Sequence, residues 1–139
     1  MKRADILQTA EKCVCGKREQ DYGKPENNFQ AIADLWNAYL NGSGFYITNI
    51  ERDAEGHLKH RQLSAFDVAM LMALLKVGRI ATGTATDDSF VDACGYLACG
   101  GEIMENTHEF NRAVENGNVQ YVNDVIHDDR DPGSGAKQY

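Results

Sequence analysis

The chain has 139 residues and a formal net charge of −7, and this length suits one domain with a real hydrophobic core. The acidic balance disfavours a nucleic-acid backbone as the main ligand, because proteins that bind one carry basic stripes. No apolar run reaches the roughly 20 residues of a membrane span, and the N-terminal MKRADILQTAE lacks the apolar core of a secretory signal. We therefore expect a cytoplasmic protein that binds neither nucleic acid nor membrane.

The four cysteines fall inside helical patterns, and none belongs to a CxxC pair or has partner histidines at zinc spacing. They are Cys13, Cys15, Cys94 and Cys99. Reduced thiols in the core of a cytosolic protein explain them.

Two helices are predicted in the first third of the chain. Apolar residues recur at helical spacing over residues 4–15, and Gly16 follows where a helix-ending glycine is expected. Pro25 suits the first turn of a second helix that runs to about Leu40. The residues predicted to be buried on it are Phe29, Ile32, Ala33, Trp36 and Leu40.

Residues 44–63 have a different pattern. FYITNIE is rich in β-branched and aromatic residues, and a turn of the form Asp53-x-x-Gly56 separates it from GHLKHRQL. This order predicts a β-hairpin with Gly56 in the left-handed region. Such a hairpin is marginal alone, so we expect it to lie on the body, on a partner subunit or over a site.

Two central helices are predicted next, the first over residues 65–81 after a capping box, Ser64-x-x-Asp67. Its near-continuous apolar character places it in the middle of a bundle. The second has a possible capping box at Ser89-x-x-Asp92, a predicted buried stripe and glycines that permit close helix approach. The stripe comprises Phe90, Cys94, Leu97 and Met104, and the glycines are Gly95, Gly100 and Gly101.

After Asn116-Gly117 the apolar residues of 119–126 allow one more short helix, and residues 127–139 contain no large apolar anchor. The prediction is a single helical domain over residues 1–126 followed by a disordered tail over 127–139. The fold class is all-α, a bundle of four or five helices with a hairpin inserted at about 44–63. Small residues at its helix contacts favour assembly as a homodimer or larger homo-oligomer.

Asp88 and Asp92 lie four residues apart on one helix, where two carboxylates can bind Mg²⁺ through oxygen ligands. Helix capping explains the same residues equally well. Lys76 and Arg79, three residues apart, either pair with these acids or hold phosphate, since an apolar helix does not bury an unpaired charge. Asp67 has a capping role, with metal binding as the alternative.

A polar patch surrounds the break at Gly23 and Pro25. A solvated loop is one interpretation of this patch. The other is a substrate clamp, in which Arg18 and Lys24 bind phosphate, Tyr22 stacks on a base and Asn28 bonds to the base edge.

The block pattern of residues 4–104, outside the hairpin, resembles a small family frequent in phages and prophages, itself similar to the MazG-like all-α NTP pyrophosphohydrolases. The motifs that carry the resemblance are Arg18-x-x-Asp21-Tyr22-Gly23-x-Pro25-x-x-Asn28-Phe29, Asp67-Val68-Ala69, Leu74-Leu75-Lys76-x-x-Arg79 and Asp88-Ser89-x-x-Asp92-x-x-Gly95-Tyr96. MazG-like enzymes hold Mg²⁺ with four acids in ExxE and E/D-x-x-D motifs. Here the 25–40 region offers only Glu26 at its start, and the second pair is spaced Asp88-x-x-x-Asp92.

The resemblance implies Mg²⁺-dependent hydrolysis of an NTP or dNTP to the monophosphate and pyrophosphate, in the host cytoplasm if the chain is phage-encoded. Asp88, Asp92, Asp67 and Glu26 are then the acids that hold and use the metal, and Lys76, Arg79, Arg18 and Lys24 bind phosphates. A second hypothesis is a non-catalytic protein that sequesters a nucleotide or cyclic-nucleotide signal of host immunity. A third is a structural helical oligomer.

Overall fold

The computed structural model describes residues 1–16 and 23–118, which form four helices and one two-stranded antiparallel sheet. The elements are α1 (Arg3–Val14), α3 (Pro25–Gly42), β1 (Ile47–Arg52), β2 (Leu58–Arg61), α4 (Ala65–Ala81) and α5 (Asp87–Glu115). The chain divides into two compact units, Met1–Ile103 and Met104–Tyr139, so that the boundary falls inside α5. The prediction of a mainly helical protein with a hairpin near residues 44–63 is confirmed.

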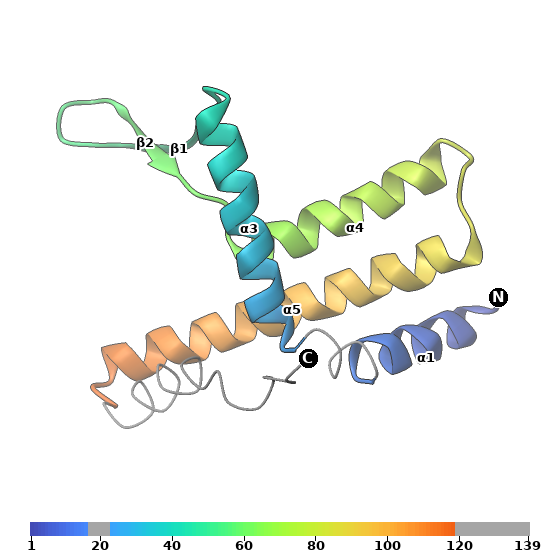
Figure 1. Cartoon of the computed structure of the whole chain (residues 1–139). Coiled ribbons are helices and arrows are strands. Elements are labelled where there is room, and N and C mark those ends of the chain that lie inside the picture. The colour runs from blue at the N-terminus through green and yellow to red at the C-terminus, as the bar shows by residue number, and fades with distance from the viewer. Residues whose placement is uncertain (17–22, 119–139) are drawn as a thin grey trace, which may run out of the picture. The chain divides into compact units, whose positions relative to one another are not determined.

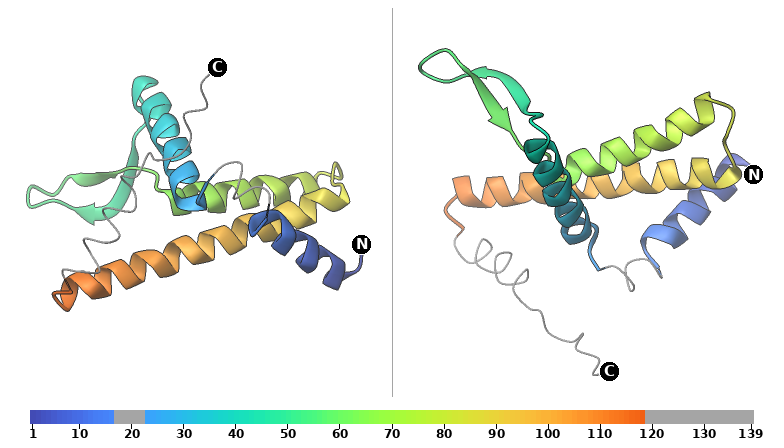
Figure 2. Two further views of the ribbon diagram at one scale, coloured as in Figure 1. Left: turned by 60° about the horizontal axis from the view of Figure 1, so that its bottom comes forward. Right: turned by 45° about the horizontal axis from the view of Figure 1, so that its top comes forward.

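In the first unit, α4 and the beginning of α5 run antiparallel side by side, and α3 crosses them steeply (Figures 1 and 2). The helix α1 packs along the start of α5, where a Cβ atom added at Gly95 would lie 3.1 Å from the Val14 Cγ1 atom. The Met1 ammonium also lies 3.5 Å from an Asp87 carboxylate oxygen. The first unit is therefore organised around the α4–α5 pair.

The core lies where α3, α4 and α5 meet. Its buried side chains are Phe29, Ala33, Ala65, Val68, Ala69, Cys99 and Ile103. Small residues dominate this set, which lets the helices approach closely. A Cβ atom added at Gly100 would lie 2.4 Å from Met70 Cε and 3.3 Å from Ala69 Cβ, so the predicted role of this glycine in close packing agrees with the structure. Gly101 has open space around it.

Local turn chemistry follows the sequence closely. Asp53 Oδ1 accepts hydrogen bonds from the Glu55 and His57 N–H groups, at 3.0 and 2.8 Å, and Gly56 has φ of +86°. At the start of α4, Ser64 and Asp67 form the predicted capping box. The hairpin turn and the cap were thus predictable because their signals are local.

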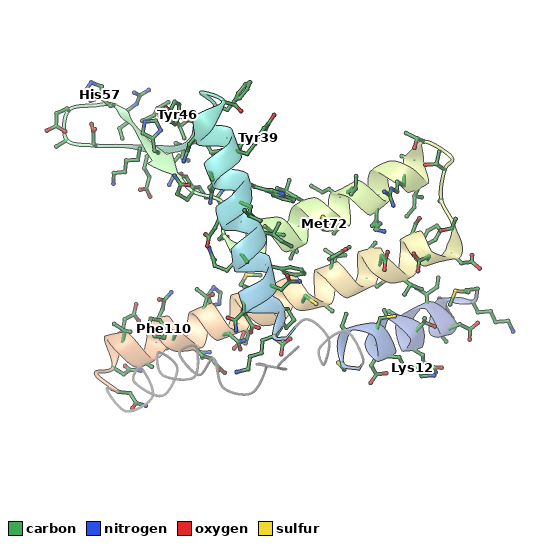
Figure 3. All side chains as sticks on the ribbon, viewed as in Figure 1. Lys12, Tyr39, Tyr46, His57, Met72 and Phe110 are labelled. Atoms are coloured by element: carbon green, nitrogen blue, oxygen red, sulfur yellow. The ribbon has the colours of Figure 1, made fainter. Side chains whose placement is uncertain are left out.

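The hairpin extends away from the helices (Figure 1), and Figure 3 shows Tyr46 near its base and His57 near its turn. Side-chain hydrogen bonds join it to the body. Arg61 of β2 donates to the Asp67 carboxylate of α4. The Asn37 side chain of α3 donates to the Leu63 carbonyl at 2.9 Å and accepts from the Leu63 N–H at 2.8 Å. Most of the hairpin residues are exposed, Ile50 by 93%, so its assignment to assembly or to a lid stays a prediction.

Two expectations for α5 are wrong. In the predicted stripe of α5, Phe90, Leu97 and Met104 are 42%, 53% and 42% exposed, because the helix packs on α4 through small residues such as Gly100. The capping box at Ser89-x-x-Asp92 does not form, because α5 begins at Asp87 and the Asp92 carboxylate pairs with Lys76 instead.

The helix α4 is buried on one face only. Ala65, Val68, Ala69, Ala73 and Lys76 face the body. The opposite face is apolar but exposed, rather than enclosed in the middle of a bundle.

The short helix expected within 119–126 and the tail at 127–139 lie outside the described residues. The single domain over 1–126 stays a prediction. Within the part of the chain that the structure describes, no helix has the length and apolarity to cross a membrane.

Candidate functional site

A partly open cavity of about 320 Å³ lies between α1, the start of α3 and α5. Residues from three separate parts of the chain line it: Cys13, Val14, Gly23, Pro25, Asn28, Phe29, Val91, Asp92, Gly95, Tyr96 and Cys99. Its position follows from the fold. The steep crossing of α3 over α5 leaves the start of α3 beside α5, and Gly95 lets α1 pack closely on the same helix, so that the cavity lies between α1 and the start of α3.

Two aromatic rings and two uncharged polar groups characterise the walls. The rings of Phe29 and Tyr96 lie 6.2 Å apart at 42° to each other. Within residues 1–16 and 23–118, no hydrogen bond engages the side-chain amide of Asn28 or the Tyr96 hydroxyl. A cavity that is mostly apolar and presents a few such groups is typical of a small-molecule site.

A buried ion pair stands beside this cavity. The Lys76 Nζ atom of α4 lies 2.5 Å from the Asp92 Oδ2 atom of α5, and the two side chains are 11% and 7% exposed. Asp92 also lines the cavity. Of the two interpretations of these charges, the structure shows the ion pair between helices for Lys76 and Asp92.

Asp67 lies at the other end of α4. Nine residues of helix separate it from Lys76, an axial rise of about 13 Å. Its carboxylate accepts two hydrogen bonds from Arg61 Nη2, at 2.5 and 2.7 Å, and others from the Ser64 N–H and hydroxyl, both at 2.8 Å. Burial alone would raise the pKa of Asp67, but the hydrogen bonds from Arg61 and Ser64 outweigh it and hold the pKa below its usual value.

The remaining predicted residues lie in several places. Asp88 and Arg79 are exposed, and within the described ranges neither bonds to the Lys76–Asp92 pair. Lys24 and Glu26 flank Pro25 at the cavity wall, Lys24 exposed and Glu26 half-buried. Arg18 and Tyr22 lie outside the described residues. The structure thus brings Asn28 and Asp92 to one cavity, with Lys76 behind Asp92 and Lys24 and Glu26 near the wall.

The predicted acids do not gather into a single ligand set. Asp92 pairs with Lys76, Asp67 caps α4, and Asp88 is exposed. Among residues 1–16 and 23–118, no three His, Cys, Asp or Glu side chains lie together as a metal site would require. The metal-binding roles proposed for Asp88, Asp92, Asp67 and Glu26 stay predictions.

Sequence reasoning assigned no site role to Phe29, Tyr96, Cys13 or Cys99, all of which line the cavity. Burial raises the pKa of the Cys99 thiol, and the nearby Glu102 and Cys15 raise it further, so this cysteine is protonated and unreactive at neutral pH. The sequence could have indicated a site role for Tyr96, because an aromatic residue next to Gly95, on a helix of small residues, is well placed to border a cavity.

Residues 5–104 match the model of a family described as "Domain of unknown function (DUF6378)". The chain belongs to this family. The matched range contains the whole cavity. No solved structure matches the chain.

Two phage proteins are similar to the chain. The "Gene 55 protein" of Mycobacterium phage D29 is 33% identical over 104 residues, which are 75% of this chain and 56% of that protein. The "Gene 55 protein" of Mycobacterium phage L5 is 36% identical over 91 residues, 66% of this chain and 47% of that protein. The chain therefore spans about half the length of these relatives.

Proposed function

We propose that the cavity between α1, α3 and α5 binds a nucleotide, with its base inside and its phosphates at the opening. The observation that carries this proposal is the side-chain amide of Asn28 and the Tyr96 hydroxyl, both without a partner in the described residues, on the wall of a cavity with two aromatic rings. An amide offers a donor and an acceptor together, which matches the edge of a nucleobase. The rings supply the apolar surface that a base stacks on.

Binding of the phosphates depends on cationic side chains near the opening of the cavity. Lys24 stands between the lining residues Gly23 and Pro25, and the sequence predicts that Arg18 and Tyr22 join it. An acidic protein binds an anionic ligand most readily when a divalent cation bridges the charges. The resemblance to MazG-like NTP pyrophosphohydrolases supports a nucleotide as the ligand class.

Binding without cleavage is the form that the geometry supports best. Asp92 is the predicted metal ligand on the cavity wall, and the Lys76 ammonium at 2.5 Å already neutralises it. A carboxylate paired in this way is a weaker ligand for Mg²⁺. We propose a phage protein that sequesters a nucleotide or cyclic-nucleotide signal of host immunity.

Pyrophosphohydrolysis is the second candidate, and the position of Asp92 on the cavity wall is the observation in its favour. In that case Asp92 would hold Mg²⁺ instead of pairing with Lys76, and the ion would supply an activated water for hydrolysis. The products separate the two candidates, because a sequestering protein returns its ligand intact.

The test measures binding and product together. The purified protein is incubated with a panel of linear and cyclic nucleotides, with and without Mg²⁺, and the ligand is separated after denaturation. Asn28→Ala should weaken binding by about 5-fold to 150-fold, since the lost base contact costs about 1–3 kcal/mol. Asn27→Ala, on the exposed side of the same turn, is the matched control and should bind like the wild type. Wild-type protein that binds no nucleotide would refute both candidates.

A further inference from the structure

The outward face of α4 has no charged side chain between Asp67 and Arg79, except Lys76, which is buried. The exposed residues of this stretch include Leu71 (43%), Leu74 (62%), Leu75 (48%) and Val77 (50%). Nothing lies within 4 Å of the position that a Cβ atom would take at Gly78. A monomer rarely exposes an apolar stripe this continuous unless something binds there.

We infer that a second copy of this chain covers this stripe, with the two α4 helices antiparallel about a two-fold axis between Leu74 and Leu75. The order of the exposed residues along α4 is the reason for proposing a second copy as the partner. In that register Leu74 of each copy packs on Leu75 of the other, and Leu71 of each copy fits the gap at Gly78 of the other. A large residue opposite a missing side chain is the complementarity that a self-pairing helix needs.

The charges at the two ends of the stripe support the same arrangement. Asp67 stands at the N-terminal end of α4 and Arg79 at the C-terminal end. In the antiparallel register, Arg79 of one copy comes within one helical turn of Asp67 of the other, at both ends of the interface. A parallel pair would instead place like charges together and align the two helix dipoles.

The neighbouring helix enlarges the surface. A stable interface buries about 800 Å² on each partner, more than one short helix offers. On α5, Phe90 and Leu97 are 42% and 53% exposed. Leu97 lies three residues before Gly100, which packs against Ala69 and Met70 of α4, and therefore borders the same side of the helix. Four helices, α4 and α5 of each copy, then enclose the apolar residues that the single chain leaves exposed.

Sedimentation tests the inference with the full chain. The wild type should have about twice the 15.4 kDa mass of the chain, and Leu74→Glu should reduce this to one chain without changing helix content. Leu7→Glu is the matched control, because Leu7 is 62% exposed on α1 and away from the stripe; it should keep the doubled mass.

A mixing experiment tests the register. Leu74→Glu and Leu75→Lys should each give single chains, whereas an equimolar mixture should recover the doubled mass, since the new acid faces the new base only between unlike chains. A monomeric wild type, or a doubled mass that survives Leu74→Glu, overturns the inference. A mixture that stays monomeric overturns the register.

Discussion

Lys76 of α4 and Asp92 of α5 form a buried ion pair at 2.5 Å, and it joins the two helices around which the first unit is built. Both side chains have lost nearly all their contact with water. A pair of this kind adds little net stability, because desolvation of the two charges offsets their attraction. Its strongest effect appears when one partner is removed and the other charge stays buried.

We predict that Lys76→Met lowers the free energy of unfolding by about 3 to 5 kcal/mol. Adding Asp92→Asn to this variant should restore part of the loss, because the buried carboxylate that has lost the Lys76 ammonium is then replaced by an uncharged amide. Lys12→Met, which removes an exposed cation on α1, is the control and should change stability by about 0.5 kcal/mol or less. Urea denaturation of the four proteins measures these effects. Equal losses for Lys76→Met and the double variant would mean that water reaches Asp92.

The carboxylate of Asp67 should make the free energy of unfolding depend on pH under acidic conditions. Its pKa is lower in the folded chain than its usual value, so its contribution is complete above the unfolded pKa of about 4 and is lost as the pH falls through the folded pKa. Denaturation at a series of pH values below 5 should therefore show a smaller pH-dependent loss for Asp67→Asn than for the wild type.

Arg61→Met removes the partner that lowers the pKa of Asp67 the most. It removes the hydrogen bonds of 2.5 and 2.7 Å to Asp67, so its pH profile should fall between those of the wild type and Asp67→Asn. A variant profile identical to the wild type would mean that the Ser64 cap alone holds the carboxylate.

Parts of this fold could be predicted from sequence because their signals are local. Asp53 and Gly56 specify their turn within four residues, and Ser64 and Asp67 specify the start of α4 in the same way. The buried face of α5 depends instead on contacts with another helix. The apolar pattern of the sequence predicts burial of the large residues Phe90 and Leu97, whereas the close helix contact requires small residues such as Gly100.

The candidate site was predicted only in part, because some of its features depend on local sequence and others on contacts between helices. Asn28 was identified because a polar residue beside an apolar helix face has a local pattern, and it does line the cavity. The pairing of Lys76 with Asp92, rather than of all four charges, depends on the register between α4 and α5. Spacing along each helix gives no information about that register.

Replacement by alanine should destabilise the protein at Gly100 but not at its neighbour Gly101. An added Cβ atom at Gly100 meets Ala69 and Met70, and one at Gly101 meets nothing within 4 Å. Gly101→Ala should raise the free energy of unfolding by about 1 kcal/mol through helix propensity, and Gly100→Ala should lower it by about 1 to 3 kcal/mol through overpacking. Thermal and urea unfolding compare the two variants. Similar stabilisation by both would show that α4 has room to move away from α5.

The last prediction concerns the link between α3 and the segment that leads from the hairpin into α4. Asn37 binds both backbone groups of Leu63, at 2.8 and 2.9 Å. Asn37→Ala leaves these half-buried groups without their partners, which should cost about 1 to 3 kcal/mol. Because the hairpin is joined to the body next to this point, hydrogen exchange should quicken in β1 and β2 more than in α5. Asn41→Ala, on an exposed position of the same helix, should leave both measurements unchanged. Faster exchange spread evenly over all elements would mean that Asn37 supports the whole first unit rather than the hairpin.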